Sequence, residues 1–267
     1  MSSLKELSNL RNRRALITGA TGGLGKIHAE TLAELGADLI LVDRPGSDFK
    51  TLHNDLVEKW GVRVEFFYCD LERGEDRINL ISEVKKVSKN LNILVNNAAL
   101  VGSSDLTGWS VPFEDQSIDT WRKALEINLT AVFELCQGLV PLMNTSRGAS
   151  IINISSIYGL YAPDWNLYQN TGMNNPAAYM ASKSGLIGLT RWLATTTAPK
   201  IRVNAIAPGG IFRSQPEEFI RRYSSKTPLG RMANEDDFRG AISYLASDLS
   251  NYVTGQVLSV DGGYGLS

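Results

Sequence analysis

The stretch RRALITGATGGLGKIHAETLAELGA, residues 13–37, predicts how this chain begins to fold. It starts with an apolar run that ends at Thr18, which is typical of a buried strand, and it finishes with a helical run. Between the two, Gly19, Gly23 and Gly25 have the spacing G-x-x-x-G-x-G. Glycines placed so let the backbone turn tightly and approach a pyrophosphate, and the helix N-terminus behind them supplies free N–H groups. A glycine cluster alone occurs in many loops, but between strand and helix it predicts a dinucleotide-binding unit.

Length, composition and charge restrict the class of protein. The chain has 267 residues, of which 43% are hydrophobic, enough for one large α/β domain. Its net charge of −1 gives no electrostatic reason to expect nucleic acid or an anionic membrane as a partner. Cys69 and Cys136 lie in apolar runs, which favours reduced core residues over a disulfide. His28 and His53 lack the spacing of metal ligands, so we expect no metal site.

The N-terminal residues carry no signal of export. They lack the apolar core of a signal peptide, and no apolar run approaches a membrane span. We therefore expect a cytoplasmic protein. Residues 1–12 are polar with three spaced leucines, and we expect them to form an arm that packs on the body.

Apolar runs alternate with helical patterns along the rest of the chain, which favours an α/β fold with a parallel sheet. No repeat or linker divides it, so 1–267 is expected to be a single domain. After the first strand, the expected strands are DLILVDR (38–44), RVEFFYCDL (63–71), LNILVNNAAL (91–100), ASIINISS (149–156), KIRVNAIAPGGI (200–211) and GQVLSVDGG (255–263). The later helices are expected near 47–60, 73–90, 114–143, 178–197 and 234–247.

Two acidic residues end strands of this series. Asp43 comes 24 residues after Gly19, near the spacing expected of a carboxylate that binds the adenine ribose. A carboxylate there repels a 2′-phosphate, which favours NAD(H) and makes NADP(H) the weaker candidate. Arg44 beside it could hold that phosphate or could be a solvated surface charge. Asp70 could reach the adenine edge or cap the next helix.

The stretch PAAYMASKSG, residues 176–185, carries a candidate acid/base. Tyr179 and Lys183 are four residues apart, so on a helix they share one face. A nearby ammonium favours the phenolate and would lower the pKa of the tyrosine toward the range useful for proton transfer. The alternative is an ordinary surface pair. Asn128, in EINLTAVF, lies among apolar neighbours within its predicted helix, so a buried role is expected for it.

In this order the motifs resemble the short-chain dehydrogenase/reductase family over about residues 12–264. The resemblance rests on TGATGGLG, Asp43, Asp70, NNAA at 96–99, Asn128, ISS ending at Ser156, YMASK, and PGGI at 208–211. It implies a single Rossmann-like, doubly wound α/β domain with a seven-stranded parallel sheet flanked by helices. It also implies a cofactor site formed by Gly19, Gly23, Leu24, Gly25, Asp43, Asp70, Leu71, Asn97, Ala98, Ala99, Tyr179, Lys183, Gly209 and Ile211.

The family's catalytic roles map onto four residues of this sequence. The resemblance implies that Tyr179 takes the proton of an alcohol and that Lys183 lowers its pKa and holds the nicotinamide ribose. It implies that Ser156 hydrogen-bonds the reacting oxygen, and that Asn128 holds a water leading from Lys183 to solvent. From the residues alone, the tyrosine–lysine pair is an activated acid/base, and the serine is a neutral donor at a strand end.

The chain departs from the family pattern at two places. Ser156 and Tyr179 are 23 residues apart, so some ten residues are inserted relative to the usual spacing. Past PGGI, Arg213 stands where family members often have a threonine that contacts the nicotinamide amide. An arginine there could bind an anion.

We expect an NAD-dependent oxidoreductase that acts on a secondary alcohol or ketone of a polar, sugar-like substrate. Aromatic rings stack on sugars and amides bind their hydroxyls, and the 157–178 insertion is rich in both. The insertion could instead contact another subunit. Residues 209–232 are expected to form a mobile lid, and the chain a homo-oligomer, a tetramer or a dimer. Alternatives are a 3-oxoacyl thioester (acyl-carrier-protein) reductase and a catalytically silent binding protein. The expected substrate contacts are Ser156, Tyr158, Trp165, Tyr168 and Arg213.

Overall fold

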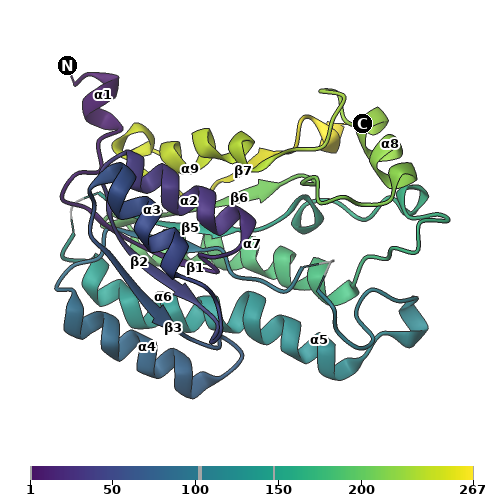
Figure 1. The fold of residues 1–267 in the computed structure, drawn as a ribbon, viewed down its shortest axis with the longest axis horizontal. Coiled ribbons are helices and arrows are strands. Elements are labelled where there is room, and N and C mark those ends of the chain that lie inside the picture. The colour runs from purple at the N-terminus through teal and green to yellow at the C-terminus, as the bar shows by residue number, and fades with distance from the viewer. Residues whose placement is uncertain (1, 102–103, 147, 267) are drawn as a thin grey trace.

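Seven parallel strands form one sheet in the computed structural model, which describes residues 2–101, 104–146 and 148–266. The strand order is β3-β2-β1-β4-β5-β6-β7. This confirms the predicted seven-stranded parallel sheet and Rossmann-like fold (Figure 1). The strands are β1 (Arg14–Thr18), β2 (Asp38–Asp43), β3 (Val64–Tyr68), β4 (Ile93–Asn96), β5 (Ala149–Ile154), β6 (Ile201–Pro208) and β7 (Val257–Val260).

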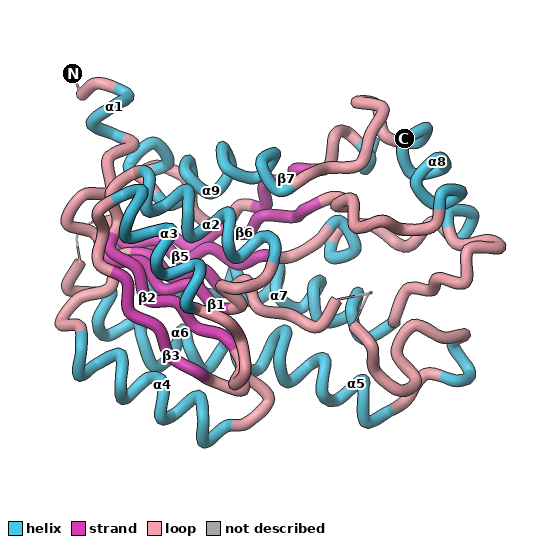
Figure 2. Tube along the Cα trace, in the orientation of Figure 1, coloured by secondary structure: helices cyan, strands magenta, loops and turns pink. Residues whose placement is uncertain are grey.

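Helices cover both faces of this sheet (Figures 1 and 2). Helices α2, α3 and α9 pack on one face, and α4, α6 and α7 on the other. Besides the short α1 (Leu4–Leu7), the helices are α2 (Gly23–Glu34), α3 (Lys50–Trp60), α4 (Gly74–Val87), α5 (Ile118–Leu125), α6 (Ala131–Met143), α7 (Ala177–Thr197), α8 (Glu217–Lys226) and α9 (Arg239–Ala246). The short helical turns outside these are η1 to η7 and are given where they matter.

The alternation of side chains along the strands creates the two cores. In β1, Ala15 and Ile17 join the core under α2, whereas Leu16 between them joins the core under α6. Successive residues of a strand point to opposite faces, so a strand covered on both sides must be apolar throughout. This is why β4, β5 and β6 are buried along their whole length.

The strand order reverses direction between β1 and β4, and this reversal positions the site. From β1 the chain builds outward to β2 and β3, and then returns to place β4 on the other side of β1. The connections therefore diverge at the carboxyl ends of β1 and β4 and leave a crevice between them. In open α/β sheets this crevice is where ligands bind.

The helix expected over 114–143 begins later than predicted and is interrupted. A 3₁₀ turn, η1 (Phe113–Asp115), precedes it, and α5 begins after Ser117, whose side chain accepts a hydrogen bond from a backbone N–H of the first turn. A π-helical turn, η2 (Glu126–Thr130), separates α5 from α6. Such turns insert one residue into a helix and are frequent at functional sites.

The same run, from Ile118 to Met143, corrects the expectation that no segment approaches a membrane span. By length and by a mean hydropathy of 1.2 it is apolar enough to cross a membrane. Here it belongs to a helical layer: Val132, Leu135 and Leu139 pack into the core beneath the sheet. Glu126 and Glu134 of this run both bind Arg77 of α4, each with a contact of 2.6 Å. A core helix of a soluble fold passes the same test of length and hydropathy.

The regions outside the sandwich contain short elements. The expected N-terminal arm, of which residues 2–12 are described, holds α1 and ends near Leu10, which is completely buried. The 157–178 segment contains two 3₁₀ turns, η3 (Ile157–Gly159) and η4 (Trp165–Leu167). Helix α8 lies within 209–232, the range of the expected lid. The division into arm, insertion and lid remains a prediction.

Candidate active site

The glycine loop follows β1 as the sequence predicted. Gly19 has a φ of +63°, and a Cβ atom on it would lie 2.9 Å from the Cα of Ala98. A Cβ atom on Gly25 would lie only 2.0 Å from the carbonyl oxygen of Gly19. Side chains at these two positions are therefore excluded by backbone atoms. Gly22, the cap of α2, places no side chain of its own over the first turn of the helix.

Asp43 at the end of β2 is held by the glycine loop. Its Oδ2 accepts hydrogen bonds from the backbone N–H of Thr21 (2.9 Å) and from the Thr21 hydroxyl (2.7 Å). Its Oδ1 accepts one from the backbone N–H of Arg44 at 2.8 Å. The carboxylate is thus fixed in orientation at the carboxyl edge of the sheet, whereas Arg44 is exposed.

Asn97 and Asp70 contribute differently from one another. The amide of Asn97 donates to the carbonyl oxygens of Thr18 (2.9 Å) and Gly19 (3.1 Å), so it braces the glycine loop from β4. Asp70 accepts a hydrogen bond from the backbone N–H of Glu72 at 3.0 Å. It does not cap α4, whose cap residue is Arg73, and it lines the cavity described below.

Ser156, Tyr179 and Lys183 come together where β5 meets α7. Tyr179 and Lys183 lie one turn apart on the helix, and Ser156 lies close enough to Tyr179 to affect the pKa of its phenol. The Ser156 hydroxyl accepts a hydrogen bond from the backbone N–H of Tyr158 at 3.1 Å. Ser155 fixes the helix, because its hydroxyl donates to the carbonyl oxygen of Lys183 at 3.0 Å. The Nζ of Lys183 donates to the carbonyl oxygen of Ile154 at 2.7 Å and lies 5.8 Å from the centroid of the Tyr179 ring. The sheet edge and the helix together hold the three side chains in one place.

Burial shifts the pKa values of Tyr179 and Lys183 in opposite directions. It raises the pKa of the Tyr179 phenol and lowers the pKa of the Lys183 ammonium, the latter to about 7. For Tyr179, burial is the largest cause of the shift and the contact with Ser156 opposes it. The role of Lys183 in lowering the pKa of Tyr179 stays a prediction.

Asn128 is buried in the π turn, as expected, and its side chain makes hydrogen bonds within the chain. Its role in holding a water stays a prediction. Its amide nitrogen donates to the carbonyl oxygen of Leu100 (3.1 Å) and to the hydroxyl of Ser182 (3.0 Å). Its Oδ1 accepts from the backbone N–H of Leu100 at 2.8 Å. Both amide protons are therefore donated within the chain, so the side chain braces the loop after β4 against α7.

A cavity of about 1220 Å³ lies along the carboxyl edge of the sheet. Every residue predicted for the cofactor lines it: Gly19, Gly23, Leu24, Gly25, Asp43, Asp70, Leu71, Asn97, Ala98, Ala99, Tyr179, Lys183, Gly209 and Ile211. So do four of the five predicted substrate contacts, namely Ser156, Tyr158, Tyr168 and Arg213. Asn128 and Trp165 are not among the lining residues. The structure therefore gathers one continuous site from elements spread over most of the chain.

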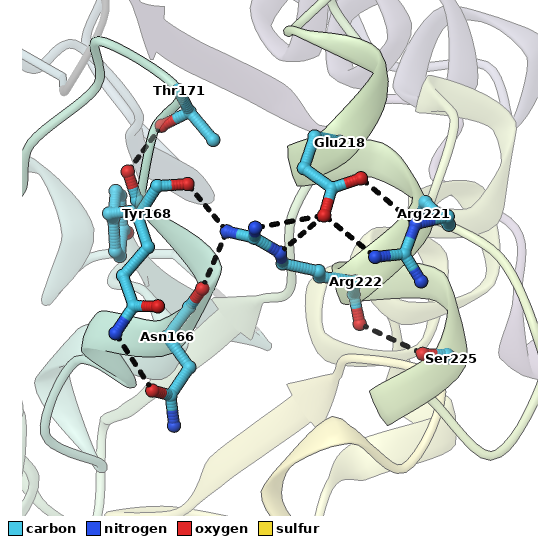
Figure 3. Close-up of polar contacts among 8 residues, drawn as sticks. Asn166, Tyr168, Thr171, Glu218, Arg221, Arg222 and Ser225 are labelled. Atoms are coloured by element: carbon cyan, nitrogen blue, oxygen red, sulfur yellow. Dashed lines mark hydrogen bonds and ion pairs between the residues drawn. The ribbon is translucent and has the colours of Figure 1, made fainter.

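The 157–178 segment packs against α8 of its own chain (Figure 3). Arg222 donates from Nη1 to the carbonyl oxygens of Asn166 (2.8 Å) and Gln169 (2.6 Å), and Glu218 holds its guanidinium from the other side at 2.8 Å. Lys226 of the same helix pairs with Asp164 at 2.8 Å. These contacts fix the segment to α8 at its outer surface.

Aromatic packing continues the same contact toward the cavity. The rings of Tyr168 and Phe219 lie 5.5 Å apart, and the hydroxyls of Tyr158 and Tyr168 are hydrogen-bonded at 2.5 Å. Burial raises the pKa of both tyrosines, so both remain protonated donors at neutral pH. Trp165, predicted as a substrate contact, is 55% exposed and lies outside the cavity lining, against Tyr168 at 5.8 Å between ring centroids.

Several cavity residues were not predicted. Thr21 escaped notice because its role depends on Asp43, far away in sequence. Phe219 and Tyr223 lie on α8, four residues apart, a helical spacing that could have indicated one buried face in the segment treated as a lid. Met173 and Met232 line the same region with no sequence signal beyond their apolar character.

These residues fit a nicotinamide dinucleotide. The glycine cradle excludes a Cβ atom where a pyrophosphate would approach, the N-terminus of α2 attracts anions, and Asp43 can accept from ribose hydroxyls. The hydroxyls of Ser156 and Tyr179 form a polar group at the other end of the cavity, beside Lys183. Such a parallel sheet, with a glycine loop and a Ser–Tyr–Lys group at its carboxyl edge, defines an oxidoreductase of the dinucleotide-binding class.

Comparison with known proteins specifies that class. A family model described as enoyl-(acyl carrier protein) reductase matches residues 19–265. The chain is 31% identical over 259 residues to the 3-oxoacyl-[acyl-carrier-protein] reductase FabG of Aquifex aeolicus, covering 95% of this chain and 98% of that one. The chain therefore belongs to the short-chain dehydrogenase/reductase family.

Two solved structures are similar over nearly their whole lengths. One is a short-chain dehydrogenase from Leptospira borgpetersenii with bound NAD⁺, with a TM-score of 0.83 and 32% identity, covering 99% of this chain and 96% of that one. The other is a putative NAD(P)-dependent gluconate 5-dehydrogenase from Beutenbergia cavernae with bound NADP, with a TM-score of 0.85 and 31% identity, covering 98% and 100%. These neighbours bind NAD⁺ in one case and NADP in the other.

Proposed function

We propose that the chain transfers a hydride between NAD(H) and a secondary alcohol or ketone of a polar, sugar-like substrate. The observation that carries this proposal is the meeting of Ser156, Tyr179 and Lys183 at one end of a cavity whose other end is the glycine loop. The bound nicotinamide supplies or accepts the hydride. The residues of the chain provide position and proton transfer.

Tyr179 is the acid/base in this proposal. In the reduction direction its phenol gives a proton to the carbonyl oxygen and becomes a phenolate, and in the oxidation direction that phenolate takes the proton of the substrate hydroxyl. Ser156, beside Tyr179, donates to the same reacting oxygen and holds it in place. Lys183 is poised to share protons near neutral pH, because its pKa is about 7. Asn128 acts through the loop and helix that it braces.

Asp43 supports NAD(H) over NADP(H). Its carboxylate is fixed by Thr21 and faces the cavity, so a 2′-phosphate on the adenine ribose would meet a negative charge. Arg44 is exposed and offers the counter-argument, since a guanidinium can bind a phosphate. We give the effect of Asp43 more weight than that of Arg44, because hydrogen bonds fix the orientation of the Asp43 carboxylate.

The wall near Ser156 supports a polar substrate. Tyr158 and Asn174 line the cavity and carry hydroxyl and amide groups. The likeness to a putative gluconate 5-dehydrogenase agrees with a polyhydroxy substrate. A homo-oligomer and a cytoplasmic location complete the proposal.

A second candidate is a 3-oxoacyl thioester reductase. The FabG relatives favour it, and so do Met173, Phe219 and Met232, whose apolar side chains line the cavity and could contact an acyl chain. A catalytically silent binding protein is the candidate of a different class, against which the presence of Ser156, Tyr179 and Lys183 in one site argues.

A substrate panel separates the three. Sugars, sugar acids, polyols and 3-oxoacyl thioesters are offered with NAD⁺ or NADH, and with the phosphorylated cofactors, and turnover is followed by absorbance of the reduced nicotinamide. Turnover of polyhydroxy substrates with NAD(H) supports the proposal, turnover of thioesters alone supports the second candidate, and cofactor binding without turnover of any compound supports the silent protein.

A further inference from the structure

Two charged side chains lie against the glycine loop at the beginning of α2. Arg213 comes from the loop after β6, and Glu235 from the 3₁₀ turn η5 (Glu235–Phe238) before α9. A Cβ atom built on Gly23 would lie 2.6 Å from Nη2 of Arg213 and 2.8 Å from Oε1 of Glu235. The two charged groups also form an ion pair with each other. Each is partly open to solvent, so neither is locked in a core.

The loop that carries Arg213 holds it in this position. The backbone N–H of Arg213 donates to Oε1 of Gln215 at 2.7 Å, and Nε2 of Gln215 donates back to the carbonyl oxygen of Ile211 at 2.8 Å. Nη1 of Arg213 also donates to the carbonyl oxygen of Phe212 at 3.0 Å. The guanidinium therefore reaches the glycine loop from a braced turn.

Glu235, the partner of the Arg213 guanidinium, lies at a helix end that favours anions. The first N–H groups of a helix have no intrahelical acceptor, and the helix dipole makes that end positive. The first turn of α2 contains no acidic residue, and its cap, Gly22, makes no side-chain hydrogen bond. The carboxylate of Glu235 is thus a negative group that the chain itself brings to this positive end, beside Arg213.

We propose that Arg213 is a ligand of the cofactor's pyrophosphate and that Glu235 takes the place of the phosphates until the dinucleotide binds. This inference rests on the proposed function and adds a binding residue to it. On binding, Arg213 exchanges one anionic partner for another, and its planar guanidinium can hold two phosphate oxygens at once. Arg213 is then a cofactor contact and not the substrate contact that the sequence suggested.

The exchange predicts that substitutions of Arg213 and of Glu235 change the affinity for phosphate-carrying ligands in opposite directions. Loss of Arg213 removes an attractive group and weakens the binding of any ligand that carries a pyrophosphate. Loss of the Glu235 charge removes a competitor for Arg213 and a repulsive group for the phosphates, so it strengthens the same binding. A ligand without phosphate should not respond to either change.

The experiment measures equilibrium binding to the full chain without any substrate. NADH, ADP and adenosine are titrated into the unmodified protein and into Arg213→Met, Arg213→Lys and Glu235→Gln by calorimetry, with thermal melting to verify folding. Arg231→Met is the matched control, because Arg231 pairs with Asp237 on the same 3₁₀ turn, at 2.6 Å, but does not line the cavity.

We expect Arg213→Met to raise the Kd of NADH and of ADP roughly tenfold, with Arg213→Lys intermediate. Glu235→Gln should lower both Kd values, and adenosine binding should stay unchanged in every variant. The proposal is overturned if Arg213→Met leaves both Kd values unaltered, or if Arg231→Met weakens binding equally. A Glu235→Gln variant that binds NADH more weakly overturns the role of Glu235. If the unmodified protein binds no NADH, the proposed function itself fails, which is a distinct result.

Discussion

The ammonium of Lys183 donates a hydrogen bond to the main-chain carbonyl oxygen of Ile154, 2.7 Å away. This contact ties the second turn of α7 to the last residue of β5, immediately before the serines that follow. It also explains why Lys183 keeps a buried position although burial lowers its pKa to about 7. The acid/base therefore depends on the register between strand and helix as much as on the spacing along α7.

Tyr179→Phe tests the acid/base directly. The substitution removes the phenol oxygen and leaves the ring, so the packing of α7 should be preserved. Turnover should fall by about 10²- to 10⁴-fold, the usual contribution of a positioned acid/base, while the Kd of NADH stays the same. Steady-state kinetics and a fluorescence titration of NADH measure the two quantities. Full activity of the variant would show that the mechanism is wrong.

Asp43→Ala tests the choice of cofactor. The unmodified protein should bind NADH more tightly than NADPH, and the variant should reduce that preference by about tenfold, because a repulsive charge is gone. Thr21→Val is the matched control, since it removes one hydrogen bond to the carboxylate without removing the charge. It should leave the preference in place. Equal or tighter binding of NADPH by the unmodified protein would point to Arg44 as a phosphate ligand.

Arg222→Gln tests whether the 157–178 segment must be fixed to α8 for substrate binding. The variant loses the bonds to the carbonyl oxygens of Asn166 and Gln169 shown in Figure 3. Substrate KM should rise about fivefold, which corresponds to the roughly 1 kcal/mol expected of such a contact near solvent, with little change in kcat.

Arg221→Gln provides the comparison for this experiment. Arg221 binds the same Glu218, at 2.7 Å, but is 66% exposed, and its bonds stay within α8. It should therefore leave KM unchanged. If Arg222→Gln instead alters the oligomeric state at constant KM, the segment serves a subunit contact.

Light scattering tests the expected homo-oligomer. Phe133 of α6 and Trp192 of α7 are 40% and 57% exposed, and large apolar groups on neighbouring helices favour a protein interface. We expect a tetramer or a dimer of the 29.2 kDa chain, and we expect Trp192→Glu to dissociate it. Tyr252→Glu, at a fully exposed residue in a loop, is the control and should have no effect. A monomer at micromolar concentration would contradict the expectation.

The features of the site that the sequence predicted are those that depend on residues close together along the chain. The glycine loop, Asp43 and the Tyr179–Lys183 pair depend on spacing within one strand, turn or helix, so their positions in the cavity could be anticipated. The strands on the buried side were recognisable because a parallel sheet covered on both faces is continuously apolar. The seven-stranded parallel architecture followed from the resemblance of these motifs, in order, to one family.

The features that were missed depend on contacts between distant segments. Trp165 was grouped with Tyr168 by composition, yet only Tyr168 packs on Phe219, more than 50 residues further along the chain, and turns toward the cavity. The role of Asn128 depends on a π turn that presents its amide to Leu100 and Ser182. The pKa of Tyr179 depends on how completely the fold buries it, which no spacing along a helix reveals.

The buried side chain of His28 allows us to predict how the free energy of unfolding changes with pH. It is buried in α2, neither ring nitrogen has a hydrogen-bond partner in the described residues, and burial lowers its pKa from 6.5 to about 4. The unfolded chain takes up a proton below about pH 6.5, whereas the folded chain resists it until about pH 4. Stability that is present above pH 6.5 is therefore lost as the pH falls, by about 2 kcal/mol between pH 7.5 and 5.

Urea denaturation at the two pH values measures this loss. His28→Leu, which keeps the volume and cannot take up a proton, should reduce the loss by that amount. An equal loss in His28→Leu and in the unmodified protein would assign the acid sensitivity to other groups.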